Sequence, residues 1–233
     1  MKLEKVTKAK SDRWYDDACG TAHALELVGE RWSLLIVREL MFGPRRFSDL
    51  RRGLPGISAN VLTQRLDGLE GAGILTRRAL PPPAAAQVYE LTPWGYQAEP
   101  AIAELGRWAA RSPAHDPTLP LSPASIMLSL RTMFTPERAD GVSVAIGFRF
   151  GAEAFLATVA DGALDVRRAE PEGADAVLAT TPEVVAALIY GGAPPSELEK
   201  AGALTISGDE GALARFAPLF SLPPKAEQAR TST

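Results

Sequence analysis

The sequence predicts an α+β fold in two domains: a first domain of helices with a two-stranded hairpin, and a second with a mostly antiparallel sheet of four or five strands covered by helices. Its 233 residues exceed one typical domain of ~100 to 150 residues. Residues 111–120 contain three prolines and no apolar periodicity, which is typical of a linker. Helical periodicity dominates before this segment, and strand-like alternation follows it. We therefore expect a tail, a first domain, a linker, a second domain and a second tail at residues 1–18, 19–111, 112–120, 121–222 and 223–233.

The composition is that of an ordinary globular protein, with 46% hydrophobic and 23% charged residues. No apolar run approaches the ~18 residues of a membrane span, and the N-terminus lacks the apolar stretch of a secretory signal. We therefore expect a cytoplasmic protein with no membrane partner. The single cysteine, Cys19, excludes an intrachain disulfide and an all-cysteine metal site, which fits a reducing compartment.

Charge is distributed unevenly along the chain, although the formal net charge is only −3. Residues 1–112 carry 16 Lys and Arg against 13 Asp and Glu, whereas residues 113–233 carry 9 against 15. Between Pro44 and Arg78, seven arginines face three acids. A solvated helix surface can account for such a count, so the positions of the arginines must decide whether they meet nucleic acid.

Three helices are expected at the start of the first domain. Apolar residues at helical spacing predict two of them over 22–28 and 32–40, the second ended by Gly43-Pro44. A short third helix, about 47–53, stops at Leu54-Pro55-Gly56, which favours a turn.

A fourth helix, from the N-cap residue Ser58 to Gly71-Ala72-Gly73, is expected to present a polar face. Leucines at positions 62, 66 and 69 form one apolar stripe, so at 100° per residue the hydrogen-bonding side chains point outward. A helix with such a face fits the DNA major groove, where Asn and Gln pair with adenine edges. The residues expected to read bases are Ser58, Asn60, Thr63 and Gln64.

Two short strands and a last helix complete the first domain. The segments 74–80 and 87–91, joined by the proline-rich 81–86, predict a hairpin, and Thr92-Pro93 starts a helix that runs to residue 110. A short helix, a turn, a polar-faced helix and an arginine-bearing hairpin together predict a winged helix-turn-helix with double-stranded DNA as its partner. The alternative is that the polar face and the hairpin are only solvated surface. The residues expected to contact phosphates are Arg45, Arg46, Arg51, Arg52, Arg65, Arg77 and Arg78.

The order and spacing of many residues from Cys19 to Trp108 match a known family. They include Gly29-Glu30-Arg31-Trp32, Gly43-Pro44-Arg45-Arg46-Phe47-Ser48-Asp49-Leu50, Leu54-Pro55-Gly56-Ile57-Ser58, Gly73-Ile74-Leu75 and Tyr89-Glu90-Leu91-Thr92. On these residues the chain resembles the HxlR-type winged-helix regulators. The resemblance implies a bacterial transcriptional regulator that binds a palindromic operator as a homodimer. It also implies dimer contacts from the first and last helices of the domain and entry of the helix from Ser58 into the major groove.

The last helix of the first domain is more apolar than a small helical core needs, which agrees with a dimer contact. The alternative is that this surface packs on the second domain. The residues expected at the dimer interface are Tyr96, Ile102, Leu105 and Trp108.

The second domain is expected to begin with an apolar helix over 123–134. Alternation over 142–150 predicts a strand with one buried face, and 153–160 with 163–168 predict a hairpin whose Asp161-Gly162 favours a type I′ turn. Further expected elements are a strand at 175–180, a helix at 181–190, a strand at 203–207 and a helix at 209–220.

This order of elements resembles the sterol-carrier-protein fold over residues 121–222. The resemblance implies an apolar cavity between the sheet and the helices, able to take a hydrophobic small molecule. Apolar residues at such spacings more often fill a packed core, and that alternative remains open. The residues expected to line the cavity are Met127, Phe148, Phe150, Phe155, Val185, Leu188, Ile189 and Phe216.

The sequence does not favour an enzyme, and no catalytic residue, metal site or cofactor is expected, because two histidines, one cysteine and no phosphate loop offer little chemistry. Two regulatory hypotheses remain: a hydrophobic effector bound by the second domain, or a thiol switch at Cys19, where many HxlR-type relatives carry a redox-sensing cysteine. A helix N-terminus would lower the pKa of Cys19, whereas the adjacent Asp16 and Asp17 would raise it. We rank the effector first, because the second domain would otherwise lack a role. Under the thiol hypothesis that domain serves dimerisation or partner binding.

Overall fold

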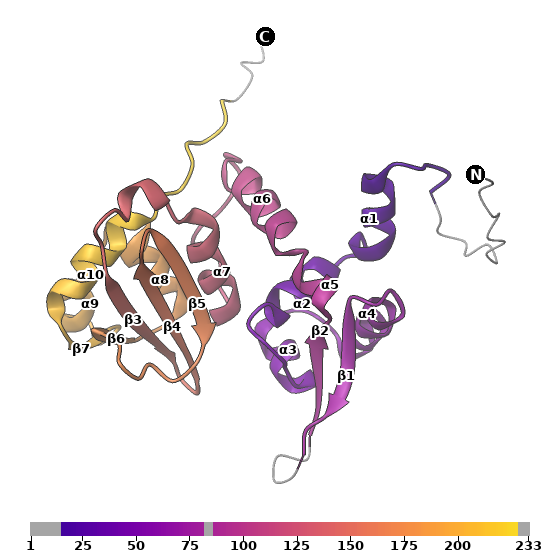
Figure 1. Cartoon of the computed structure of the whole chain (residues 1–233), viewed down its shortest axis with the longest axis horizontal. Coiled ribbons are helices and arrows are strands. Elements are labelled where there is room, and N and C mark those ends of the chain that lie inside the picture. Colours follow the sequence, from indigo (N-terminus) through magenta and orange to yellow (C-terminus); the bar gives the residue numbers. More distant parts are fainter. Residues whose placement is uncertain (1–14, 82–85, 228–233) are drawn as a thin grey trace.

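The computed structural model describes residues 15–81 and 86–227 and shows two domains side by side (Figure 1). Residues 1–14 and 228–233 of the expected tails, and residues 82–85 of the expected hairpin tip, lie outside the described residues. In the described part of the chain, no helix is long and apolar enough to cross a membrane.

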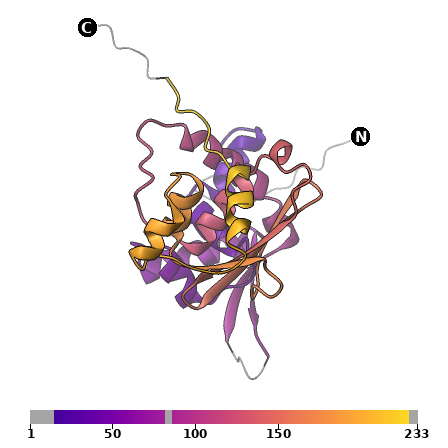
Figure 2. The ribbon, with the colours of Figure 1, turned by 90° about the vertical axis from the view of Figure 1, so that its left-hand side faces the viewer.

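The first domain is a winged helix-turn-helix, as the sequence predicts. Arg45 and Tyr89 exchange backbone hydrogen bonds with N···O distances of 2.9 and 2.8 Å, so a single β-bridge connects the start of α3 to the hairpin. The hairpin projects beyond the rest of the fold in both views (Figures 1 and 2). The elements are α1 (Gly20–Val28), α2 (Ser33–Leu40), α3 (Phe47–Gly53), α4 (Ala59–Gly71), β1 (Leu75–Ala79), β2 (Gln87–Leu91), α5 (Pro93–Tyr96) and α6 (Glu99–Ala110).

The prediction of a single helix over 93–110 is wrong, because the segment forms two helices, α5 and α6. Pro100 explains the break, since it has no N–H to donate to the Tyr96 carbonyl and its ring clashes with that group in a continuous helix. Gly95 lets α5 lie against the hairpin, because a Cβ at this position would be 2.1 Å from the Ile74 carbonyl oxygen.

The second domain contains a mixed five-stranded sheet with helices packed on it, which confirms the predicted fold class. The strand order is β5-β4-β3-β6-β7, and β3 and β6 run parallel while the other neighbours are antiparallel. Asp161 and Gly162 both have positive φ, at 51° and 74°, as a type I′ turn requires. The elements are α7 (Pro123–Met133), the 3₁₀ turn η1 (Pro136–Arg138), β3 (Val144–Phe150), β4 (Glu153–Ala160), β5 (Ala163–Arg168), β6 (Ala176–Ala179), α8 (Pro182–Ile189), α9 (Pro195–Lys200), β7 (Thr205–Gly208), α10 (Glu210–Phe216) and the 3₁₀ turn η2 (Ala217–Leu219).

Two helical details differ from the sequence prediction. Helix α9 was missed because Leu198 is its one apolar residue, so the segment has no periodicity. The helix predicted over 209–220 ends at Phe216, because Pro218 cannot donate the next helical hydrogen bond.

One connected cluster of buried apolar side chains runs through both domains. Helix α7 joins them, because it packs against α2 and α6 of the first domain and against α8 and β5 of the second. The position of the second domain relative to the helix-turn-helix is therefore set by side-chain packing as well as by the linker.

Candidate nucleic-acid interface

Helix α4 carries the candidate base-reading face. Ser58 Oγ accepts a hydrogen bond from the Val61 N–H at 3.3 Å and so caps the helix. Asn60, Thr63 and Gln64 are exposed, while the leucines of the opposite face are buried. The structure thus assigns Ser58 to the helix start and leaves three longer polar side chains facing solvent.

Exposed arginines lie on and beside α3, the helix that precedes the turn. Arg46, Arg51 and Arg52 are exposed, and Arg52 contacts Asp49 at 3.3 Å with 73% of its side chain accessible. These guanidinium groups can meet a phosphate without loss of a buried contact.

The arginines of α4 and the hairpin are ion-paired at the surface. Arg65 Nη2 lies 2.7 Å from Glu30 Oε2, and Arg77 Nε lies 2.9 Å from Glu70 Oε2. Arg78 is paired with an acid of β2 in the same way. Surface pairs of this kind contribute only ~0–1 kcal/mol, so a DNA phosphate can replace the acid partner at little cost.

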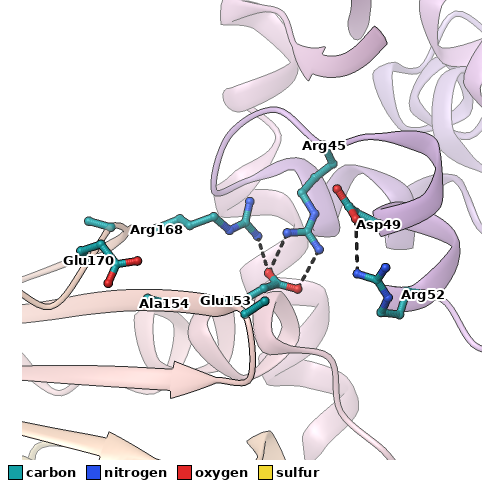
Figure 3. A pocket seen from close by; sticks show the side chains of 9 residues that line it. Arg45, Asp49, Arg52, Glu153, Ala154, Arg168 and Glu170 are labelled. Atoms are coloured by element: carbon teal, nitrogen blue, oxygen red, sulfur yellow. Dashed lines mark hydrogen bonds and ion pairs between the residues drawn. The ribbon is translucent and has the colours of Figure 1, made fainter. Parts of the chain in front are cut away.

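Arg45 is buried, so the phosphate contact predicted for it would require the side chain to leave its present partners. Its side chain reaches β4 of the second domain, where Nη1 is 2.6 Å from Glu153 Oε2 and Nη2 is 2.9 Å from Oε1 (Figure 3). Desolvation disfavours the charged guanidinium, but the hydrogen bonds and charge of Glu153 outweigh it and raise the pKa of Arg45. Arg45 therefore ties the start of α3 to the second domain.

The boundary between the domains, which we call the seam, contains further polar contacts that the sequence analysis missed. Ser122 Oγ donates to Glu39 Oε1 at 2.6 Å, and Arg131 Nη1 lies 3.0 and 2.8 Å from the carboxylate oxygens of Glu99. The Arg131 guanidinium also lies 4.5 Å from the centre of the Phe42 ring. The one signal in the sequence was Glu39, a carboxylate on the apolar face of its helix, and it is 1% exposed.

The residues expected to line a ligand cavity lie in or beside the core of the second domain. Most of them are buried, and Phe150 is partly buried. The Phe148 ring centre lies 6.1 Å from that of Phe150 and 6.2 Å from that of Phe216, so these rings contact each other. Their role in binding a ligand stays a prediction.

The sequence left open whether the apolar residues of α6 pack inside the chain or remain available for a dimer contact, and the helix has residues of both kinds. Tyr96, just before it, and Ile102 pack against the shared core. Leu105 and Trp108 are 50% and 73% exposed. Helix α1 has no fully buried residue; Leu27 and Val28 pack against the core, whereas Leu25 is 51% exposed.

Cys19 is the exposed N-cap residue of α1. Hydrogen bonds from the Thr21 backbone, the Thr21 hydroxyl and the Ala22 backbone lower the pKa of its thiol. The helix start therefore prevails over the neighbouring aspartates, of which Asp17 instead accepts a hydrogen bond from the Cys19 N–H at 2.9 Å. Across the described residues, no group of three or more His, Cys, Asp and Glu side chains is arranged to hold a metal ion.

Comparisons with known families divide the chain at the linker. The model of the HxlR-like helix-turn-helix family matches residues 27–116, and the model of the alkyl sulfatase C-terminal family matches residues 117–226.

Individual relatives match the first domain. The HTH-type transcriptional regulator YtfH of Escherichia coli is 38% identical over 99 residues, which cover 42% of this chain and 79% of YtfH. The HTH-type transcriptional regulator YodB of Bacillus subtilis is 37% identical over 86 residues, which cover 37% of this chain and 77% of YodB. Among solved structures, the reduced form of YodB shares 34% identity with a TM-score of 0.38, covering 42% of this chain and 98% of that one.

Proposed function

Because the chain belongs to the family of HxlR-like helix-turn-helix proteins and is a DNA-binding transcriptional regulator, we propose that it binds a palindromic operator as a homodimer. The observation that carries the proposal is the exposed polar face of α4, held outward by a capped helix start and a buried leucine stripe. Asn60, Thr63 and Gln64 read base edges in the major groove, while the exposed Arg46 and Arg51, at the start and end of α3, neutralise phosphates.

The exposed apolar side chains of α1 and α6 support the dimer. Leu25 on α1 and Leu105 and Trp108 on α6 are each at least half exposed, and large apolar side chains at that exposure can form an interaction surface. A two-fold dimer would present two α4 helices to half-sites centred about one helical turn of DNA, or a multiple of it, apart.

Replacing Gln64 with Ala should weaken binding to DNA from the region upstream of the protein's own gene by about 1–3 kcal/mol and binding to random DNA only slightly, because base contacts carry the sequence information. Arg51→Ala should instead weaken both equally and flatten the salt dependence, because it removes a phosphate contact. Fluorescence anisotropy at several salt concentrations measures both effects. Equal losses on the two DNAs for Gln64→Ala would remove its readout role.

We also propose that the second domain senses a hydrophobic small molecule. A mostly apolar pocket of about 410 Å³ where α2, α6 and α7 meet supports this proposal, because it adjoins both the helix-turn-helix and the proposed dimer helix. Its deepest residues, Leu128, Thr132 and Met133, are each 5% exposed. Sites for small ligands often lie at such domain junctions.

Gly106→Leu should abolish binding of the apolar probe N-phenyl-1-naphthylamine. Gly106 lines the pocket, and a Cβ at this position would meet no heavy atom within 4 Å, so a leucine fills space without a backbone clash. Ala101→Leu places the same leucine side chain on α6 outside the pocket and is the control. Probe fluorescence measures binding, and unchanged binding to Gly106→Leu would exclude this pocket.

The alternative signal is oxidation of Cys19, and the lowered pKa of its exposed thiol supports it. Alkylation of Cys19 by iodoacetamide should reach half its maximal rate at a lower pH in the folded protein than in urea, because the thiolate reacts and the α1 hydrogen bonds stabilise it. Mild oxidation with diamide should then change DNA binding in the natural protein and not in Cys19→Ser. Identical DNA binding before and after diamide would eliminate the switch.

A further inference from the structure

Two arginines at the seam share one carboxylate. Arg45 makes both of its short contacts with Glu153, and Arg168 Nη2, from the end of β5, lies 3.3 Å from Glu153 Oε2 (Figure 3). Arg168 Nη1 donates to the Phe42 carbonyl at 3.3 Å, across the seam. The two side chains are mostly buried, with 9% and 21% exposed.

This cluster holds two guanidinium groups on a single carboxylate. Within the described residues, Nε of Arg45 and Nε and Nη2 of Arg168 are buried and make no hydrogen bond. Desolvation and the nearby charge of Arg45 lower the pKa of Arg168, so Glu153 stabilises the first arginine more than the second. A second anion beside Arg168 would relieve this imbalance.

The other acids nearby already have partners of their own. Glu39 contacts Arg38 at 2.8 Å, Asp49 contacts Arg52 at 3.3 Å, and Glu170 contacts Arg149 at 2.9 Å. They therefore do not neutralise Arg168 through a direct ion pair.

A pocket of about 360 Å³ opens beside the cluster, and both domains form its walls. Asp49 and Arg52 of α3 line one side, and Glu153, Arg168 and Glu170 of the second domain line the other (Figure 3). This volume lies in the range of small-molecule sites.

We propose that the seam pocket binds a small molecule carrying an oxyanion, a carboxylate or a phosphate, through Arg168 and Arg52. The ligand supplies the negative charge that the two-arginine cluster lacks. Because it contacts α3 and the second domain together, its binding changes how firmly the helix-turn-helix is held and therefore the affinity for DNA. The regulatory part rests on the proposed DNA-binding function, whereas the binding site does not.

A DNA phosphate has the same chemistry as such a ligand, but the geometry favours a free small molecule. Arg45 is 8% exposed and Arg168 is recessed beside it, so the cluster lies below the surface that a duplex can approach. A small oxyanion can enter the pocket, whereas a backbone phosphate is attached to a rigid double helix.

The test uses inorganic phosphate as the probe and the full chain without DNA. Thermal unfolding is followed against phosphate concentration, with sodium chloride holding the ionic strength constant. A ligand of the folded state raises the melting temperature as its concentration exceeds its dissociation constant. We expect a saturable rise in the natural protein and at least tenfold weaker binding in Arg168→Gln. Arg167→Gln removes an exposed arginine of the same strand, β5, whose side chain points to the opposite face of the sheet, and it should stay within twofold.

Arg168→Gln leaves the Arg45–Glu153 pair in place. If Arg168→Gln nevertheless fails to fold, Arg52→Gln still tests the site, because the Arg52 side chain is 73% exposed and its replacement should not affect folding. Arg52→Gln should weaken phosphate binding severalfold. No saturation in the natural protein, or equal weakening in Arg167→Gln, would overturn the site. Competitive displacement of phosphate by operator DNA would overturn the small-molecule assignment, whereas binding of both with mutually altered affinities supports it.

Discussion

Replacing Glu153 with Gln is expected to lower the free energy of unfolding by about 3 kcal/mol, measured by urea denaturation, because it leaves two mostly buried guanidinium groups without a carboxylate. The substitution preserves the shape of the side chain, so the loss reports the charge. The Arg45 and Glu153 side chains are 9% and 20% exposed, so the pair is not completely buried. We therefore expect a destabilisation near the lower limit of that measured when buried ion pairs are broken.

The matched control is Glu170→Gln, which breaks the exposed pair with Arg149 at the same edge of the sheet. With 47% and 63% of the two side chains accessible, solvent screens this pair, and we expect a loss below about 1 kcal/mol. A double variant, Arg45→Met with Glu153→Leu, should recover part of the stability by replacing charges with apolar packing. Equal losses for the two glutamate variants would mean that the seam cluster adds no more than a surface pair.

Replacing Trp108 with Ala is expected to raise the dissociation constant of the homodimer about 30-fold, because a buried interface tryptophan typically contributes about 2 kcal/mol or more. Trp108 is 73% exposed in the single chain, so its removal opens no cavity in the core and the monomer fold should persist. Analytical ultracentrifugation measures the dimer, and circular dichroism checks the helices.

Leu119→Ala is the control for this prediction, since Leu119 is also an exposed apolar residue, at 62%, but lies in the linker. It should leave the dimer unchanged. Operator binding should fall with the dimer in Trp108→Ala, because each protomer then meets one half-site alone. A variant that stays as dimeric as the natural protein would show that α6 does not form the interface.

Local patterns in the sequence predicted most of the elements because their causes are local. The cap at Ser58 and the leucine stripe determine both the start of α4 and the side that it turns to solvent. Alternating residues and the Asp161-Gly162 turn likewise predicted the strands β3 to β5.

The seam could not be predicted in this way, because its contacts join residues far apart in the chain. Arg45 and Glu153 are separated by 108 positions, and neither stands out among its neighbours. Arg45 was grouped with the phosphate contacts because it belongs to an arginine-rich segment, and only the docked second domain distinguishes it from Arg46. Pro100, by contrast, is a local signal of the break between α5 and α6, because proline disrupts the interior of a helix.

The shared core at α7 has a consequence for the lifetime of the protein in a cell. Proteases act on segments that open transiently, and a two-domain chain with independent halves can lose one half while the other stays folded. Here the helix after the linker is buried in both halves at once, so opening one half removes packing from the other. Degradation of the regulator should therefore follow the opening of the whole molecule, and a partial fragment that still occupies DNA should not accumulate.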